Sequence, residues 1–462
     1  MPVQRTISPV DGRVHVEREL ATDARIADTL ERARAASRGW RTTPVEERVA
    51  VLGRAVDAFV VKRDELAREI TWQMGRPIAQ TPGEIRGFEE RARYMLEVAP
   101  EALADRPVGE KAGFTRFIRH EPLGLVFVVA PWNYPYLTAV NSVVPALAAG
   151  NAVLLKHSAQ TPLCAERFQE AFDEAGLPAG VFQHLHMDHD AALRLVASGE
   201  AQLVAFTGSV KAGRAVQAAA GRAFVATNLE LGGKDPAYVR EDADLAHAVE
   251  NLVDGACFNS GQSCCGIERI YVHERRFDDF VAGYAELAAK YVLDDPTEPA
   301  KTLGPMVRAA AADFARDQVE EAVAEGAEGL VDRRRFAREE RGSAYMAPQA
   351  LVNVTHDMRV MREESFAPIV GIMKVAGDEE AVRLMNDSDF GLTASVWTRD
   401  EEAAARIGAR VETGTWFMNR CDYLDPALAW TGVKDSGRGC ALSELAYGHL
   451  TRPKSFHLRR GS

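Results

Sequence analysis

The stretch LGLVFVVA at residues 123–130, followed by a helix-length segment and by AVLLK at 152–156, decides the fold. Both are short apolar runs without polar alternation, which is typical of strands buried on both faces of a parallel sheet. Three more apolar runs repeat the rhythm: VFQHL at 181–185, QLVAFTG at 202–208 and AFVATNLEL at 223–231. The intervening segments predict helices near 137–149, 162–176, 190–198 and 210–220. This alternation indicates a doubly wound α/β domain of the nucleotide-binding kind, although a sheet alone identifies no ligand.

The chain on either side of this core differs in character. Residues 22–100 carry apolar side chains at helical spacing among many charges, which predicts helices. Residues 232–440 read as a second mixed α/β region, with strands such as ERIYVH and TASVWT and helices near 275–291, 308–325 and 400–410. Two separate strand-like segments, RFIRHEPLG at 116–124 and RPKSFHLRR at 452–460, could pair with another subunit.

Composition narrows the function classes. The 462 residues suffice for two or three packed lobes, and Lys+Arg 55 against Asp+Glu 67 argues against a nucleic-acid partner. The sequence shows no secretory signal and no apolar run long enough for a membrane span. The six cysteines are sparse and lack CxxC spacing, so we expect a reduced, cytoplasmic setting without a disulfide framework.

The stretch GQSCC at 261–265 offers the strongest candidate for chemistry. Cys264 follows a small, polar, turn-forming run, and such a loop suits a thiolate nucleophile, whereas an isolated cysteine is more often a small buried hydrophobe. Glu230 in LELGGKDP is a candidate base, because Gly232 and Gly233 let the backbone turn and leave the carboxylate open. Taken alone, a glutamate at the end of a strand is more often a solvated or salt-bridged residue. No histidine forms a recognisable motif with either cysteine, which disfavours a cysteine hydrolase.

Seven ordered motifs resemble those of the aldehyde dehydrogenase superfamily, in its NAD(P)-dependent, hydrolytic form. They are PWNYP, LLKHSAQTP, FTGSVKAGR, LELGGKDP, GQSC, EESF and GVKDSGRG. Glu230 stands 34 positions before Cys264, which matches the base-to-nucleophile spacing of that family. The resemblance spans nearly the whole chain, from ISPVDGRV to RPKSF.

The resemblance implies three structural parts and an assembly. Residues 1–101 and 122–231 would form a Rossmann-like cofactor domain, and residues 232–442 a second α/β catalytic domain. Residues 102–121 and 443–462 would form a small β oligomerisation element, so a homodimer or homotetramer is expected.

The implied reaction oxidises an aldehyde to a carboxylic acid. Cys264 would form a thiohemiacetal and then a thioester, Glu230 would activate the water that releases the acid, and Asn133 would donate to the oxyanion. A CoA-acylating semialdehyde dehydrogenase would use the same thioester, but such members usually lack the glutamate. A non-catalytic structural protein on this fold would tolerate loss of these three residues, and all three are present.

The resemblance also assigns the cofactor site. The matching residues are Trp132, Lys156, Gly208, Ser209, Glu364 and Phe366. No G-x-G-x-x-G occurs, as is usual in this family, and the start of the helix after FTGS suits an anion. Ala159 replaces a glutamate that NAD-preferring members often carry, so NADP becomes possible. His157 and Lys211 could add positive charge there, although residues of this kind are more often plain surface residues. We expect NAD or NADP, with NAD slightly favoured, and no required metal.

Alignment with the family suggests the substrate pocket but not the aldehyde. The positions are Tyr134, Phe258, Cys265, Asp422 and Trp430. The aromatic residues suit an apolar or quaternary ammonium group, and Asp422 and Asp425 suit a hydroxyl or an amine. Asn141 stands where some semialdehyde enzymes carry an arginine, which leaves a substrate carboxylate without an anchor there. His184, His186 and His189 could in principle bind a metal, but we expect a plain strand and turn.

Overall fold

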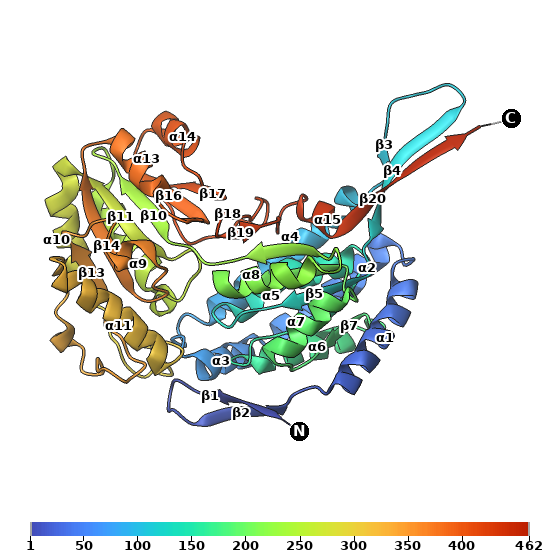
Figure 1. The fold of residues 1–462 in the computed structure, drawn as a ribbon, viewed down its shortest axis with the longest axis horizontal. Helices are drawn as coiled ribbons and strands as arrows, with labels where there is room; N and C mark the ends of the chain where they lie inside the picture. The colour runs from blue at the N-terminus through green and yellow to red at the C-terminus, as the bar shows by residue number, and fades with distance from the viewer. Residues whose placement is uncertain (1, 461–462) are drawn as a thin grey trace.

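The computed structural model describes residues 2–460. Its six-stranded sheet, called the first sheet below, confirms the predicted doubly wound core (Figure 1). The five predicted strands are parallel neighbours: β5 (Leu125–Val129), β6 (Ala152–Lys156), β7 (Phe182–His184), β8 (Leu203–Thr207) and β9 (Ala226–Glu230). The strand order is β19-β9-β8-β5-β6-β7. The sixth strand, β19 (Gly437–Arg438), comes from late in the chain and pairs antiparallel with β9.

Helices cover both faces of this sheet, as the continuous apolar runs predict. The four expected helices are α5 (Pro135–Ala148), α6 (Pro162–Glu174), α7 (His189–Ser198) and α8 (Val210–Ala220). Side chains along β5 point alternately to opposite faces. Val126 and Val128 join the core formed with α5 and α6, whereas Leu125 and Phe127 join the core formed with α7 and α8.

The N-terminal region is helical as predicted, after a hairpin that the sequence did not reveal. The hairpin consists of β1 (Val3–Ile7) and β2 (Val14–Glu19). The helices are α1 (Asp23–Trp40), α2 (Val45–Val61), α3 (Arg63–Met74) and α4 (Pro82–Ala102). Helices α2 and α4 pack on the α5 and α6 side of the sheet, and α1 packs on the other side. Among residues 2–460, no helix has both the length and the apolar character needed to span a membrane.

The second region contains a seven-stranded sheet in the order β12-β13-β14-β11-β10-β16-β17. Its strands are β10 (Asp235–Val239), β11 (Ile267–His273), β12 (Glu328–Gly329), β13 (Gln349–Val352), β14 (Ile369–Val375), β16 (Thr393–Trp397) and β17 (Thr415–Met418). The main helices are α9 (Leu245–Cys257), α10 (Phe277–Ala288), α11 (Ala309–Ala324), α13 (Asp378–Asn386) and α14 (Glu401–Gly408). The strands and helices expected in this region are therefore confirmed.

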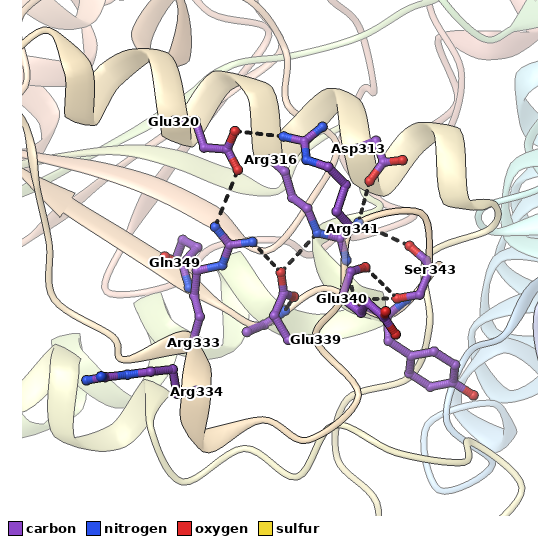
Figure 2. Close-up of polar contacts among 12 residues, drawn as sticks. Asp313, Arg316, Glu320, Arg333, Arg334, Glu339, Glu340, Arg341, Ser343 and Gln349 are labelled. Carbon is purple, nitrogen blue, oxygen red and sulfur yellow. Dashed lines mark hydrogen bonds and ion pairs between the residues drawn. The ribbon is translucent and has the colours of Figure 1, made fainter.

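An ion-pair network holds the long connection between β12 and β13 against α11 (Figure 2). Arg316 on α11 is fully buried, and its guanidinium lies 2.9 Å from Glu339 and 2.7 Å from Asp313. Glu339 also pairs with Arg333 at 2.6 Å and accepts the backbone N–H of Ala347. Because a buried charge is costly unless it is paired, this network ties the connection firmly to the helix.

A three-stranded sheet projects from the body of the molecule near the C-terminus (Figure 1). It contains β3 (Arg106–Pro107), β4 (Phe114–Pro122) and β20 (Thr451–Arg459). The two strands predicted near 116–124 and 452–460 pair with each other along their whole length. Phe117 and Phe456 face each other in this register and stack at 4.5 Å between ring centroids.

Candidate active site

The candidate nucleophile lies on a tightly constrained loop between α9 and β11. Asn259 and Ser260 adopt positive φ angles of 53° and 56°, and Gly261 follows at 68°. A side chain at Gly261 would collide with the backbone of Ala367, so only glycine fits this close approach. Gln262 fastens the loop, because its side chain donates to the Asn259 carbonyl at 3.0 Å and accepts the backbone N–H of Val307 at 2.7 Å.

Glu230 ends β9 and is half-buried. The Thr207 hydroxyl, at the end of neighbouring β8, donates to Glu230 Oε2 at 3.1 Å. Oε1 has no hydrogen-bond partner among residues 2–460. Burial raises the pKa of Glu230 to about 7, and the Thr207 hydroxyl and the Arg91 charge counteract this only partly. A carboxyl with this pKa can accept a proton near neutral pH.

Asn133 lies behind the cysteine loop. Its side-chain amide donates to the Gln262 carbonyl at 3.2 Å, two residues before Cys264. Its own carbonyl accepts hydrogen bonds from Arg76 and from the Asn259 side chain. The position is consistent with a donor aimed at the loop, although Asn133 does not line the cavity described next.

One cavity of about 410 Å³ brings Cys264 and Glu230 together. All five residues predicted for the substrate pocket line it as well: Tyr134, Phe258, Cys265, Asp422 and Trp430. Asn141 also lines the cavity, whereas Asp425 does not. The sequence-based pocket is therefore one continuous space in the structure.

The second cysteine of the pair is held differently from the first. Cys265 is buried, and its thiol donates to Asp422 Oδ1 at 2.9 Å, which also accepts the Ser263 hydroxyl at 3.0 Å. The Cys264 thiol and burial raise the pKa of the Cys265 thiol, which disfavours its thiolate. Burial likewise raises the pKa of Asp422 to about 6. Cys264 is partly exposed, so it is the more accessible thiol of the two.

Several predicted cofactor residues follow the carboxyl ends of neighbouring parallel strands. Lys156 ends β6, and Gly208 follows β8, where its N–H donates to the Glu230 carbonyl at 3.0 Å. Ser209 caps α8 by accepting the Ala212 N–H at 3.4 Å. In a doubly wound sheet this edge is where ligands bind, which explains why residues far apart in sequence meet there. Lys156 is buried without a carboxylate partner among the described residues, as suits an anionic or hydroxylated ligand.

Glu364 and Phe366 complete this edge from the second region. Glu364 accepts the backbone N–H of Gly233 at 3.0 Å, and burial raises the pKa of Glu364 to about 8. Trp132 and Phe366 meet edge to face, with ring centroids 5.7 Å apart. A Cβ at Gly232 would lie 2.5 Å from the Glu364 carboxylate, so the missing side chain leaves room for this residue. These groups fit a dinucleotide.

His157 is neither the surface residue that the sequence favours nor a source of positive charge near the adenine ribose. His157 is buried rather than on the surface, and one of its ring nitrogens lies 3.1 Å from the Pro135 carbonyl. Burial lowers the pKa of His157 to about 4, so the ring is neutral at physiological pH. Lys211 is exposed.

The histidine cluster has an ordinary structural explanation. His184 and His186 pack edge to face at 5.5 Å, and His186 Nε2 lies 3.1 Å from Glu166. Across the described residues, no group of three or more His, Cys, Asp or Glu side chains is arranged to hold a metal ion.

The sequence analysis missed charged cavity residues contributed by the N-terminal helical region. Arg76 and Glu84 form a buried ion pair at 2.5 Å, and Arg91 on α4 is buried at the cavity wall. In the sequence these charges resemble a solvated helix face. The helical spacing of Arg91 with Phe88 and Met95, both buried, was the signal that could have placed it inward.

Comparisons with known proteins agree with this geometry. The model of the Aldehyde dehydrogenase family matches residues 2–456. The chain is 36% identical over 423 residues to the succinate semialdehyde dehydrogenase [NAD(P)+] Sad of Escherichia coli K12, covering 91% of this chain and 90% of that protein. It is 34% identical over 453 residues to a succinate-semialdehyde dehydrogenase [NADP(+)] of Deinococcus radiodurans, covering 97% and 93%. The crystal structure of succinic semialdehyde dehydrogenase from Streptococcus pyogenes with NADP+ is 30% identical, with a TM-score of 0.94 over 99% of this chain and 100% of that chain.

Family model, relatives and fold therefore agree with the family that the seven sequence motifs indicate. The protein is an enzyme that oxidises aldehydes with NAD(P), and the chain belongs to the aldehyde dehydrogenase family.

Proposed function

We propose that the protein oxidises its aldehyde by covalent catalysis at Cys264. The Cys264 thiolate forms a C–S bond to the carbonyl carbon, and the resulting oxyanion receives hydrogen bonds from the Asn133 amide and the Cys264 backbone N–H. A bound nicotinamide would supply the acceptor for the hydride of that carbon, and the acyl group would then remain on Cys264 as a thioester. Glu230 then takes a proton from water, the hydroxide adds to the thioester, and the C–S bond breaks to release the acid and the thiolate.

The observation that carries this proposal is the state of Glu230. Its Oε1 atom is buried and unpartnered among the described residues, its carboxyl has a pKa of about 7, and it lines the same cavity as Cys264. A base in this state favours hydrolysis of the thioester over transfer of the acyl group to CoA, which is the alternative route.

We infer that both NAD and NADP serve as cofactor, with NAD somewhat preferred. Lys156, Gly208, Ser209, Glu364, Phe366 and Trp132 would hold the dinucleotide. Ala159 would not repel a 2′-phosphate, which supports use of NADP. The neutral His157 would not attract that phosphate, which supports the preference for NAD.

We also infer a substrate class, an assembly and a location. The relatives are named succinate semialdehyde dehydrogenases, which supports a small aldehyde that carries a carboxylate.

A homodimer or homotetramer formed through β4 and β20 is supported by their projection from the body (Figure 1). A cytoplasmic location is supported by six free cysteines. Light scattering would distinguish the two assemblies.

Substitution of each cysteine in turn tests the chemistry. Cys264→Ser should abolish formation of reduced nicotinamide with any aldehyde, because serine lacks a comparable nucleophile. Cys265→Ser should keep most of the activity, because serine can still donate to Asp422. Absorbance of reduced nicotinamide under saturating cofactor provides the measurement. The reverse result would move the nucleophile to Cys265, and activity in both variants would refute covalent catalysis at this pair.

A further inference from the structure

Arg91 is a buried cation of the cavity wall that forms no ion pair among the described residues. The residue is 8% exposed and projects from α4 into the cavity that contains Cys264. Its Nη1 donates to the Leu137 carbonyl at 2.7 Å and to Asn141 Oδ1 at 3.2 Å. Among residues 2–460, no carboxylate lies within ion-pair distance of Arg91, whereas the equally buried Arg76 is neutralised by Glu84 at 2.5 Å.

A guanidinium in this state favours an anionic ligand. A buried charge without a partner is costly, and that cost falls when a carboxylate enters the site. Nη1 is used by the protein, but Nε and Nη2 make no protein hydrogen bond among the described residues, so they are available as donors. A guanidinium edge can bind the two oxygens of a carboxylate in a planar, bidentate geometry.

Acidic residues of the same cavity suggest the opposite preference, an amino group on the substrate. Their situation differs from that of Arg91. Asp422 already accepts hydrogen bonds from Ser263 and Cys265, while Asp254 and Glu90 are exposed to solvent. Glu230 also lacks an ion-pair partner among the described residues, but it is the proposed base, so Arg91 carries the remaining buried charge that can bind a substrate group.

We propose that Arg91 binds the carboxylate at the far end of an ω-carboxylated aldehyde while the aldehyde carbon meets Cys264. Asn141 is a positioning residue, because its carboxamide oxygen holds the guanidinium in place. Asn141, on α5, has no positive charge with which to bind a carboxylate. Arg91, on α4, supplies that charge to the pocket instead. This inference rests on the proposed function and adds the residue that selects the substrate.

Three aldehydes of equal chain length test the proposal: 4-oxobutanoate, butanal and 4-aminobutanal. The wild-type enzyme should favour 4-oxobutanoate over butanal, and Arg91→Met should lower kcat/KM for 4-oxobutanoate by about 10- to 100-fold, mainly through KM. Oxidation of butanal should fall far less, because only the loss of the Arg91 charge near Glu230 affects it. Arg91→Lys should recover part of the lost kcat/KM for 4-oxobutanoate, since lysine keeps the positive charge but not the bidentate geometry of the guanidinium.

Arg93→Met is the matched control, because Arg93 lies on the same helix, is exposed and does not line the cavity. It should leave the preference intact. In the wild-type enzyme, succinate should compete with the aldehyde far better than butyrate does, which tests the anchor without any variant. Asn141→Ala should raise KM for 4-oxobutanoate and leave KM for butanal unchanged.

The outcomes separate this inference from the proposed function. If wild-type enzyme oxidises none of the aldehydes, the proposed function fails. If it oxidises butanal but does not prefer 4-oxobutanoate, or if succinate competes no better than butyrate, the role of Arg91 is refuted. Preference for 4-aminobutanal would assign selectivity to Asp422 and Asp254. Equal losses with all aldehydes in Arg91→Met would make Arg91 a structural residue.

Discussion

Glu230→Gln should separate the two halves of the reaction and stabilise the protein at the same time. The pKa of Glu230 is about 7, against an ordinary value of 4.5. Below pH 4.5 the carboxyl is neutral in both folded and unfolded chains and has no pH-linked effect. As pH rises from 4.5 to 7, the unfolded chain loses this proton first, so stability falls, and above pH 7 the cost levels off at about 3 kcal/mol. Glutamine carries no charge and avoids this cost.

The stability effect therefore has a defined pH dependence. The free energy of unfolding of Glu230→Gln should exceed that of the wild-type protein by a margin that grows by about 2 kcal/mol between pH 5.5 and pH 8. Urea unfolding at the two pH values measures this difference. Glu286→Gln, at an exposed carboxyl on α10, is the control and should show no such change.

The kinetic effect should appear only after hydride transfer. In rapid mixing experiments Glu230→Gln should still release one equivalent of reduced nicotinamide in a burst, while steady-state turnover falls by about 10²–10⁴-fold. Wild-type acyl-enzyme hydrolysis should rise about tenfold between pH 6 and pH 8, as the ionised fraction of Glu230 rises from roughly a tenth to nine-tenths. A pH-independent hydrolysis rate over this range, or unchanged turnover in the variant, would refute Glu230 as the base.

Two further substitutions test the cofactor edge and the ion-pair network on α11. Gly232→Ala should raise KM for the dinucleotide at least several-fold, because the new Cβ would lie 2.5 Å from the Glu364 carboxylate, and initial rates at varied NAD measure it. Unchanged KM would show that Glu364 does not contact the cofactor. Arg316→Met should lower the free energy of unfolding by about 3 kcal/mol, because it leaves the buried Glu339 short of a partner. An unchanged urea midpoint would show that this network adds little stability.

The parallel core was accessible from the sequence because its signal is local. Each strand from β5 to β9 is a short apolar run, and the helices between them have ordinary length and spacing. The hairpin of β1 and β2 could not be predicted, because it lacks such a local signal. Its residues are mostly exposed, so no buried face imposes an alternating apolar pattern on them.

The site was accessible only in part. Cys264, Glu230 and the aromatic pocket residues stand in recognisable motifs, whereas Arg91 lies in a charged helix whose inward face depends on packing against α5. The surroundings of His157 were misjudged because burial is a tertiary property. Its ring lies beneath the Pro135 carbonyl, 22 positions away in the chain.

The segment 230–233, where the chain passes from the first sheet to the second region, connects several of the sequence motifs. At residues 230–233 the chain leaves the first sheet, and β19 pairs with Glu230 through Gly437. Ser436 accepts the Leu231 N–H at 3.0 Å and donates its hydroxyl to the Gly232 carbonyl at 2.7 Å. A Cβ at Gly233 would collide with the Cys264 carbonyl, so the base-bearing turn lies directly against the nucleophile loop. The GVKDSGRG motif thus acts through position rather than chemistry, because it clamps the turn that sets the base, the nucleophile and Glu364 at fixed separations.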